Sequence, residues 1–115
     1  MHEVGLMANI LDTINSSARE NQISRIMEIT LVVGKFTMVL PDSMLFAFEA
    51  LTQNDPLYAD AKLTIWEKAI ECLCQQCSNT FLVEQNHCFI CPDCTSSDVQ
   101  ILSGRELYID SYEGD

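Results

Sequence analysis

The first twenty residues carry apolar side chains at the spacing of an amphipathic helix. Polar side chains such as Asn9, Asp12 and Asn15 separate apolar ones that recur every three or four positions. The recurring apolar residues are Leu6, Met7, Ile10, Leu11, Ile14 and Ala18. We therefore expect a helix over residues 4–20, ended by the polar pair at 21–22.

Three segments show the composition or the alternation of β-strands. Residues 24–34 are rich in aliphatic strand formers and reach Gly34, which is typical of a bend or bulge. Residues 60–72 and the segment RELYIDSY at 105–112 alternate in polarity. The faces predicted are Leu63, Ile65 and Glu67 against Thr64, Trp66 and Lys68 in the second strand, and Leu107, Ile109 and Ser111 together in the third.

A second helix is predicted over residues 41–53. Pro41 suits the first turn of this helix, where a backbone amide would have no partner within the helix. The helix should end before Asp55, because a residue that precedes a proline disfavours helical conformation. The predicted apolar ridge consists of Leu45, Phe48 and Leu51, flanked by Met44.

The composition changes between residues 72 and 104, where Ser, Asn, Asp and Cys dominate and no Lys or Arg occurs. The strand that follows has no local partner of its own length, so we expect it to return to the first sheet. The predicted fold class is α+β: a small mixed sheet of about three strands with two helices, plus an inserted zinc-ribbon-like module with four cysteine ligands. The predicted domains are 1–71 plus 105–115, and the cysteine module, 72–104.

Two CxxC pairs, Cys74-x-x-Cys77 and Cys91-x-x-Cys94, lie in the cysteine module, with thirteen residues between them. Zinc prefers four soft ligands in a tetrahedron, and two tight turns can supply two thiolates each. We predict that these four cysteines bind a structural zinc ion. With four thiolates at hand and no HExxH motif, the site has no open position for catalysis.

Rival ligands lie close by in the sequence. Cys88 forms a second possible pair with Cys91, and His87 offers a nitrogen. Cys72 precedes the first pair. The simpler interpretation of Cys72 and Cys88 is that they are small buried apolar side chains.

Charge restricts the partners of the chain. Seventeen acidic residues against six basic ones give a formal charge of −11, which repels nucleic acid and anionic membranes. No apolar run approaches the roughly 18 residues of a membrane span, and the start does not resemble a secretory signal. The sequence thus predicts a cytoplasmic protein with no nucleic acid or membrane partner, whose cysteines are better suited to metal than to disulfides.

The start, Met1-His2-Glu3, offers nitrogen ligands. A terminal amine, the His2 imidazole and the backbone nitrogens between them can form chelate rings around Ni(II) or Cu(II). On this chemistry alone the alternative stays open that His2 is a surface residue, with Glu3 complementing the dipole of the helix.

These features together resemble the HypA/HybF family, the nickel metallochaperones of nickel–iron hydrogenase maturation. The resemblance rests on the start MHEVGLMANIL, the middle segment ITLVVGKFTMVLPDSMLFAFEALT, and the two CxxC pairs followed by an alternating strand. It extends over nearly the whole chain in the same order.

The resemblance implies a non-enzymatic function, the delivery of Ni(II). It implies that His2 binds nickel with Glu3 beside it, the Met1 amine and backbone nitrogens completing the site, while Cys74, Cys77, Cys91 and Cys94 hold structural Zn(II). The implied partners are the nickel-handling maturation GTPase and the hydrogenase large-subunit precursor; in some organisms the family also serves urease.

Other interpretations remain open from the residues. A zinc-ribbon interaction module with an incidental His2 would bind zinc alone, and a metalloenzyme would need an open metal site with a general base. The sequence contains neither a phosphate-cradling glycine loop nor an HExxH motif, which disfavours an enzyme. Monomer and homodimer are both compatible with it.

Overall fold

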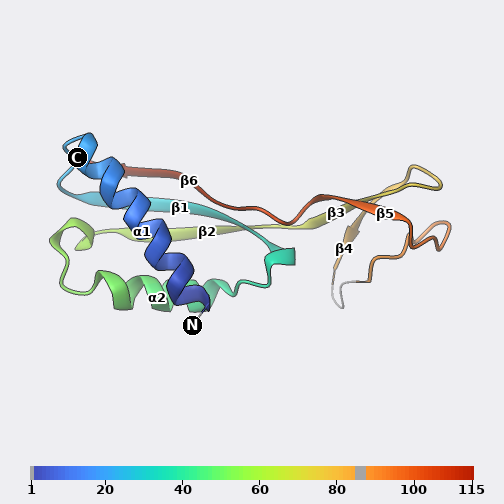
Figure 1. Ribbon diagram of the computed structural model, residues 1–115, viewed down its shortest axis with the longest axis horizontal. Coiled ribbons are helices and arrows are strands. Elements are labelled where there is room, and N and C mark those ends of the chain that lie inside the picture. Colours follow the sequence, from blue (N-terminus) through green and yellow to red (C-terminus); the bar gives the residue numbers. More distant parts are fainter. Residues whose placement is uncertain (1, 85–87) are drawn as a thin grey trace. The chain divides into compact units, whose positions relative to one another are not determined.

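The computed structural model describes residues 2–84 and 88–115 and contains two compact units (Figure 1). Unit 1 comprises Met1–Leu31, Val39–Trp66 and Tyr108–Asp115, and unit 2 comprises Val32–Met38 and Glu67–Leu107. The elements, in chain order, are α1 (His2–Glu20), β1 (Ile26–Gly34), the 3-10 turn η1 (Lys35–Thr37), α2 (Pro41–Thr52), the 3-10 turn η2 (Pro56–Tyr58), β2 (Lys62–Lys68), β3 (Ile70–Cys74), β4 (Thr80–Val83), β5 (Val99–Ser103) and β6 (Leu107–Gly114).

A three-stranded sheet, in the order β2-β1-β6, and the two helices carry the core of unit 1. The last strand of the chain therefore returns to the first sheet, as the sequence predicted. Along α1 the apolar face predicted from the sequence is buried against this core. The fully or nearly fully buried side chains of α1 are Met7, Leu11, Ile14 and Ala18. No helix in the described part of the chain is both long and apolar enough to cross a membrane.

Helix α2 forms where it was predicted, with Pro41 at its first turn. Its buried stripe differs from the predicted ridge, because Met44 and Ala47 are buried beside Phe48, while Leu51 is 42% exposed. The stripe that faces the core is thus rotated about the helix axis. Sequence spacing alone allowed either stripe, and the packing of α2 against α1 selects the observed one.

The single strand predicted over residues 60–72 is two strands, and this prediction was wrong. β2 ends at Lys68 and belongs to the sheet of β1, whereas β3 begins at Ile70 and pairs with β4 and β5. The break has no glycine or proline to mark it in the sequence. It arises because the two halves pair with different strands: β2 pairs with β1, and β3 pairs with β4 and β5.

β3 is the central strand of an antiparallel sheet in unit 2, in the order β4-β3-β5. The apolar run at 80–83 forms β4, which pairs antiparallel with β3. Cys72 faces Phe81 on one side and Ile101 on the other. The apolar core of this sheet consists of Ile70, Cys72 and Val83, with Phe81, Phe89, Val99 and Ile101 packed against them.

The alternation predicted for β6 holds only in its first half. Leu107 and Ile109 are partly buried, as expected, but Ser111 is exposed and Tyr112 is partly buried in its place. The Tyr112 hydroxyl lies 2.5 Å from Ser17 Oγ on α1. This contact with the helix holds Tyr112 on the covered side.

Backbones pass one another closely at Gly34 and Gly104 in unit 2. A Cβ added at Gly34 would lie 2.1 Å from the carbonyl oxygen of Gly104. Gly104 has a φ of +116°, and a Cβ there would lie 2.9 Å from Ile70 Cα. Both positions therefore require glycine for space, and Gly104 also requires it for its backbone conformation.

We expect Gly34→Ala to lower the free energy of unfolding by about 1–3 kcal/mol, because the added methyl meets backbone atoms that cannot rotate away. The matched control is Gly5→Ala in α1, where an added Cβ meets nothing within 4 Å. Alanine in a helix is favoured over glycine by roughly 0.5–1 kcal/mol, so this control should be more stable than wild type. Urea unfolding followed by circular dichroism measures both, and a Gly34→Ala variant as stable as wild type would contradict the expectation.

Candidate metal centre

Four cysteine thiols converge at one end of unit 2. The Sγ atoms of Cys74, Cys77, Cys91 and Cys94 all lie within 4.8 Å of one another. Two of the separations are short, at 3.5 Å between Cys74 and Cys94 and 3.6 Å between Cys77 and Cys91. The last residue of β3 supplies Cys74, and the loop between β4 and β5 supplies the second pair.

The two CxxC turns are built alike. The amide of Ser78 donates to the carbonyl of Cys74, and the amide of Thr95 donates to the carbonyl of Cys91, each at 2.9 Å. Ser78 and Thr95 both have a φ of 64°, which is uncommon for residues with a side chain. A left-handed residue directly after each second cysteine lets the chain curl back, so that each turn presents two sulfurs on one side.

Asn79 is a residue of this site that the sequence analysis missed. Its carbonyl accepts a hydrogen bond from the Cys74 amide at 2.8 Å, and its side-chain amide nitrogen lies 3.9 Å from Cys91 Sγ. The carbonyl of Ser96 accepts from the Cys91 amide in the same way, at 2.9 Å. The place of Asn79, two residues after the second cysteine of a pair, was the only signal in the sequence.

Hydrogen bonds and burial move the pKa values of Cys91 and Cys77 in opposite directions. Burial acts to raise the pKa of Cys91, but hydrogen bonds from the amides of Cys94 and Asp93, and from neighbouring thiols, lower it to about 6. For Cys77 the Asn79 backbone lowers the pKa, yet desolvation and the other three thiols outweigh it and raise the pKa to about 12. The cluster thus gives up its first proton readily and retains others, because four negative charges cannot share this space without a cation.

The donor set fits a tetrahedral metal ion. With Zn–S bonds of about 2.3 Å, a tetrahedron has edges of about 3.8 Å between sulfurs, close to the two short separations observed. Four thiolates are soft ligands, typical of closed zinc sites. Within residues 2–84 and 88–115, this is the one group of at least three His, Cys, Asp or Glu ligand atoms placed to hold a metal.

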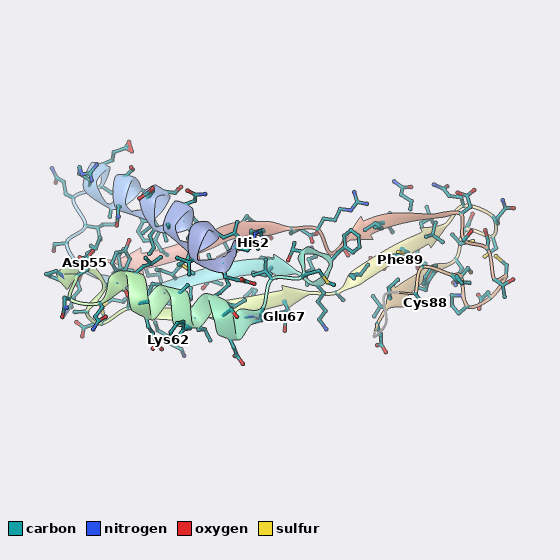
Figure 2. The ribbon with its side chains drawn as sticks, turned by 60° about the horizontal axis from the view of Figure 1, so that its bottom comes forward. His2, Asp55, Lys62, Glu67, Cys88 and Phe89 are labelled. Carbon is teal, nitrogen blue, oxygen red and sulfur yellow. The ribbon has the colours of Figure 1, made fainter. Side chains whose placement is uncertain are left out.

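The leftover cysteines lie in different surroundings. Cys72 is completely buried in the core of unit 2, and burial raises the pKa of its thiol. The prediction of a small buried side chain is confirmed there. For Cys88 it was wrong, because Cys88 is exposed in the loop between β4 and β5 (Figure 2). Cys88 does not join the four-thiol group, and His87 lies outside the described residues.

His2 and Glu3 lie in the first turn of α1, at the exposed start of the helix (Figure 2). His2 is exposed, and Glu3 is partly buried, with its Oε2 accepting from the Leu40 amide at 3.5 Å. Amides in the first turn of a helix have no partner within the helix, so the backbone nitrogens here are not engaged in its hydrogen bonds. Met1, with the predicted amine ligand, lies outside the described residues.

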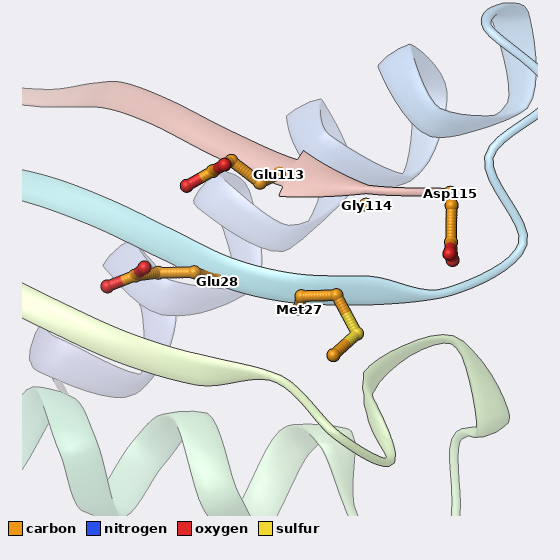
Figure 3. Close-up of a pocket in the computed structure, with 5 residues that line it drawn as sticks. All are labelled: Met27, Glu28, Glu113, Gly114 and Asp115. Atoms are coloured by element: carbon orange, nitrogen blue, oxygen red, sulfur yellow. The ribbon is translucent and has the colours of Figure 1, made fainter.

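Carboxylates gather elsewhere in unit 1 without forming a comparable group. A shallow pocket lies where the ends of β1 and β6 meet, and it is open to solvent (Figure 3). Glu28 in this pocket already accepts a hydrogen bond from Thr64 Oγ1 at 3.0 Å. The pocket is lined by Met27, Glu28, Glu113, Gly114 and Asp115. The three carboxylates among them do not lie close enough together to hold one metal ion.

Comparison with known proteins gives a consistent result over the whole chain. The family model described as "hydrogenase/urease nickel incorporation, metallochaperone, hypA" matches residues 1–114. The hydrogenase maturation factor HypA of Moorella thermoacetica is 40% identical over 115 residues, covering all of both chains. The HypA of Rhodopseudomonas palustris is 36% identical over the same length, again covering all of both.

Solved structures agree on the fold. A solution structure of the Ni metallochaperone HypA from Helicobacter pylori has a TM-score of 0.65 at 24% identity, covering 97% of this chain and 96% of the other. A second solution structure of a HypA protein has a TM-score of 0.69 at 25% identity, covering 99% and 96%. The chain belongs to the HypA family of hydrogenase/urease nickel-incorporation metallochaperones.

Proposed function

We propose that this chain carries Ni(II) as cargo to nickel–iron hydrogenase during its maturation and catalyses no reaction itself. The observation that carries the proposal is the family match over residues 1–114, which contains both the His2-Glu3 start and the four-cysteine group. Supply of nickel to urease is the related role to which the family description also points.

The proposed nickel site consists of His2 and Glu3, with the Met1 amine and backbone nitrogens. Support comes from the exposure of His2 and from the unpaired amides of the first helical turn. A planar nitrogen-rich set suits Ni(II). A site at an exposed helix start is open on one side, so a receiving protein can replace its ligands one at a time.

The proposed zinc site consists of Cys74, Cys77, Cys91 and Cys94. Zinc held by four thiolates has no free coordination position, so the ion would stabilise the fold and supply no catalysis. A bound cation would offset the repulsion between the four thiolates. The two CxxC turns are each closed by a backbone hydrogen bond, from Ser78 to Cys74 and from Thr95 to Cys91. We assign the nickel site to a domain of residues 1–71 plus 105–115, and the zinc site to residues 72–104.

The proposed partners are the maturation GTPase that handles nickel and the hydrogenase large-subunit precursor, with no nucleic acid or membrane partner. A cytoplasmic location goes with these partners, and the chain acts as a monomer or homodimer. Its formal charge of −11 supports the exclusion of polyanions.

Replacing His2 tests the nickel site. We expect His2→Ala to abolish nickel binding in isothermal titration calorimetry, because the imidazole is the one side-chain nitrogen of the proposed site. The control is His87→Ala, which removes the other histidine of the chain and should leave nickel affinity unchanged. Equal affinities of His2→Ala and wild type would refute the assignment.

The contribution of the terminal amine is tested separately. We expect a chain extended by two residues before Met1 to bind nickel much more weakly, because the new amine cannot close the same chelate ring with His2. An extended chain that releases its extra residues to a protease should regain full affinity. Full affinity before cleavage would exclude the amine as a ligand.

Thiol alkylation of the zinc-loaded chain tests the zinc site. We expect rapid modification of Cys88, which is exposed, and protection of the four proposed ligands by the metal. Cys72 should also stay unmodified, but for a different reason, because it is buried and should react only on unfolding. Peptide mass spectrometry locates each modified thiol.

Serine variants separate metal protection from burial. Cys94→Ser should lose zinc to a chelator that wild type resists, whereas Cys88→Ser should keep it, since Cys88 lies outside the four-thiol group. Alkylation of Cys74 in the zinc-loaded protein, or zinc loss from Cys88→Ser alone, would overturn the ligand set.

A further inference from the structure

The outer face of the sheet in unit 2 carries exposed leucines among polar side chains. Its inner face packs the core, and its outer face carries the alternate residues of each strand. In register, Leu82 lies opposite Glu71, and Leu73 lies between Thr80 and Gln100. On the other side of Glu71 the register shifts, so that Leu102 and Ser103 together oppose it.

Leucines from all three strands thus surround one carboxylate. Leu82 is 57% exposed and Leu102 is 46% exposed, while Leu73, on the central strand, is partly buried. We call this set, Leu73, Leu82 and Leu102 around Glu71, the leucine face. Leu82 is directly opposite Glu71, where Cβ atoms lie about 5 Å apart, and Leu73 is a diagonal neighbour at about 7–8 Å, still within reach of a long side chain. Glu71 therefore lies at the centre of the three leucines.

The Glu71 carboxylate has no counterion on this face. Its residue is partly buried, and no side-chain hydrogen bond or ion pair joins the carboxylate to any residue within 2–84 and 88–115. The nearest lysine in sequence, Lys68, pairs with Glu106 at 3.7 Å. No Lys or Arg occurs between residues 72 and 104, so the strands beside β3 offer none.

A second copy of this chain does not fit the face. Two leucine faces brought together would place one Glu71 near another between chains that each carry a formal charge of −11. The chemistry instead complements a partner of opposite charge.

We propose that the leucine face is a docking surface for a protein partner that presents a basic side chain, best an arginine, among apolar side chains. The leucines exclude water, and the arginine pairs with Glu71. A guanidinium is more weakly hydrated than an ammonium group and matches a carboxylate with two parallel hydrogen bonds, so it suits a site that loses water on binding.

The probes for the test are the maturation GTPase and the hydrogenase large-subunit precursor. This choice of probes rests on the proposed function. Biolayer interferometry measures the affinity of the zinc-loaded full chain for each. We expect the double variant Leu82→Gln/Leu102→Gln to bind one of them at least tenfold more weakly. Glu71→Gln should weaken the same complex about tenfold, because a charge-assisted pair is lost.

Salt distinguishes the ion pair from a general loss of fold. Raising NaCl should weaken the wild-type complex, and this dependence should be shallower for Glu71→Gln. The matched controls, Leu51→Gln on α2 and Glu113→Gln on β6, replace an exposed leucine and an exposed carboxylate outside the face and should bind as wild type does. Zinc content and melting temperature are measured on every variant.

The proposal would be overturned if every face variant bound both probes with an affinity within twofold of wild type. It would also be overturned if the wild-type chain bound neither probe. Nickel titration on the same samples keeps this result apart from the proposed function. Variants that lose docking but retain nickel affinity support the leucine face. A His2→Ala chain that docks normally shows that docking does not depend on the nickel site.

Discussion

The close passage of Gly104 past Gly34 and Ile70 is the constraint on which the cysteine module depends. The chain begins β3 at Ile70 and leaves β5 just before Gly104, so the two ends of the insertion must come together here. Hydrogen bonds fix the crossing: Gly34 donates to the Glu106 carbonyl at 2.6 Å, and Glu106 Oε1 accepts from the Gly104 amide at 2.7 Å. Hydrogen bonds from the amide of Glu106 itself and from the Gly104 amide, with the nearby Lys68, lower the pKa of the Glu106 carboxyl. Larger side chains at the two glycines would force these backbones apart.

The two candidate metal sites differ in ways that follow from their surroundings. The thiols of the four-cysteine group are held by paired turns whose backbone bonds are satisfied, and Cys74 and Cys91 are completely buried. His2 and Glu3, in contrast, lie in the first turn of a helix, where His2 is exposed and the amides have no partner within the helix. A closed thiolate cage retains its ion, whereas an open nitrogen site exchanges ligands. The proposed assignment therefore gives the resident zinc ion to the four thiolates and the transient nickel ion to the nitrogen ligands of the helix start, because ligand softness and geometry differ between the two sites.

Local signals in the sequence were sufficient to predict the helices and the four converging cysteines, but they did not predict how separate segments pair and pack. Helical spacing located α1 and α2, and the CxxC spacing picked out the four cysteines that converge. The division of residues 60–72 between two sheets was missed, because an alternating run reads the same whether its halves share a partner or not. Leu51 and Ser111 were placed on the wrong side for a related reason: the packing of α2 against α1, and the contact of Tyr112 with Ser17, override the local pattern. Cys88 was expected to be buried from residue type alone and is exposed.

By itself the sequence determined the two helices, the two CxxC pairs and the sign of the charge, because periodicity, spacing and net charge are properties of the chain as written. Only the tertiary structure decided how residues 60–72 divide between two sheets, which face of each strand is covered and where a carboxylate lies without a counterion. These depend on register, and register is set by pairing between segments far apart in sequence, such as Cys72 with Ile101. A shift of one residue along β3 would exchange Glu71 and Leu73 for Cys72 and Cys74, and with them the outer face for the core.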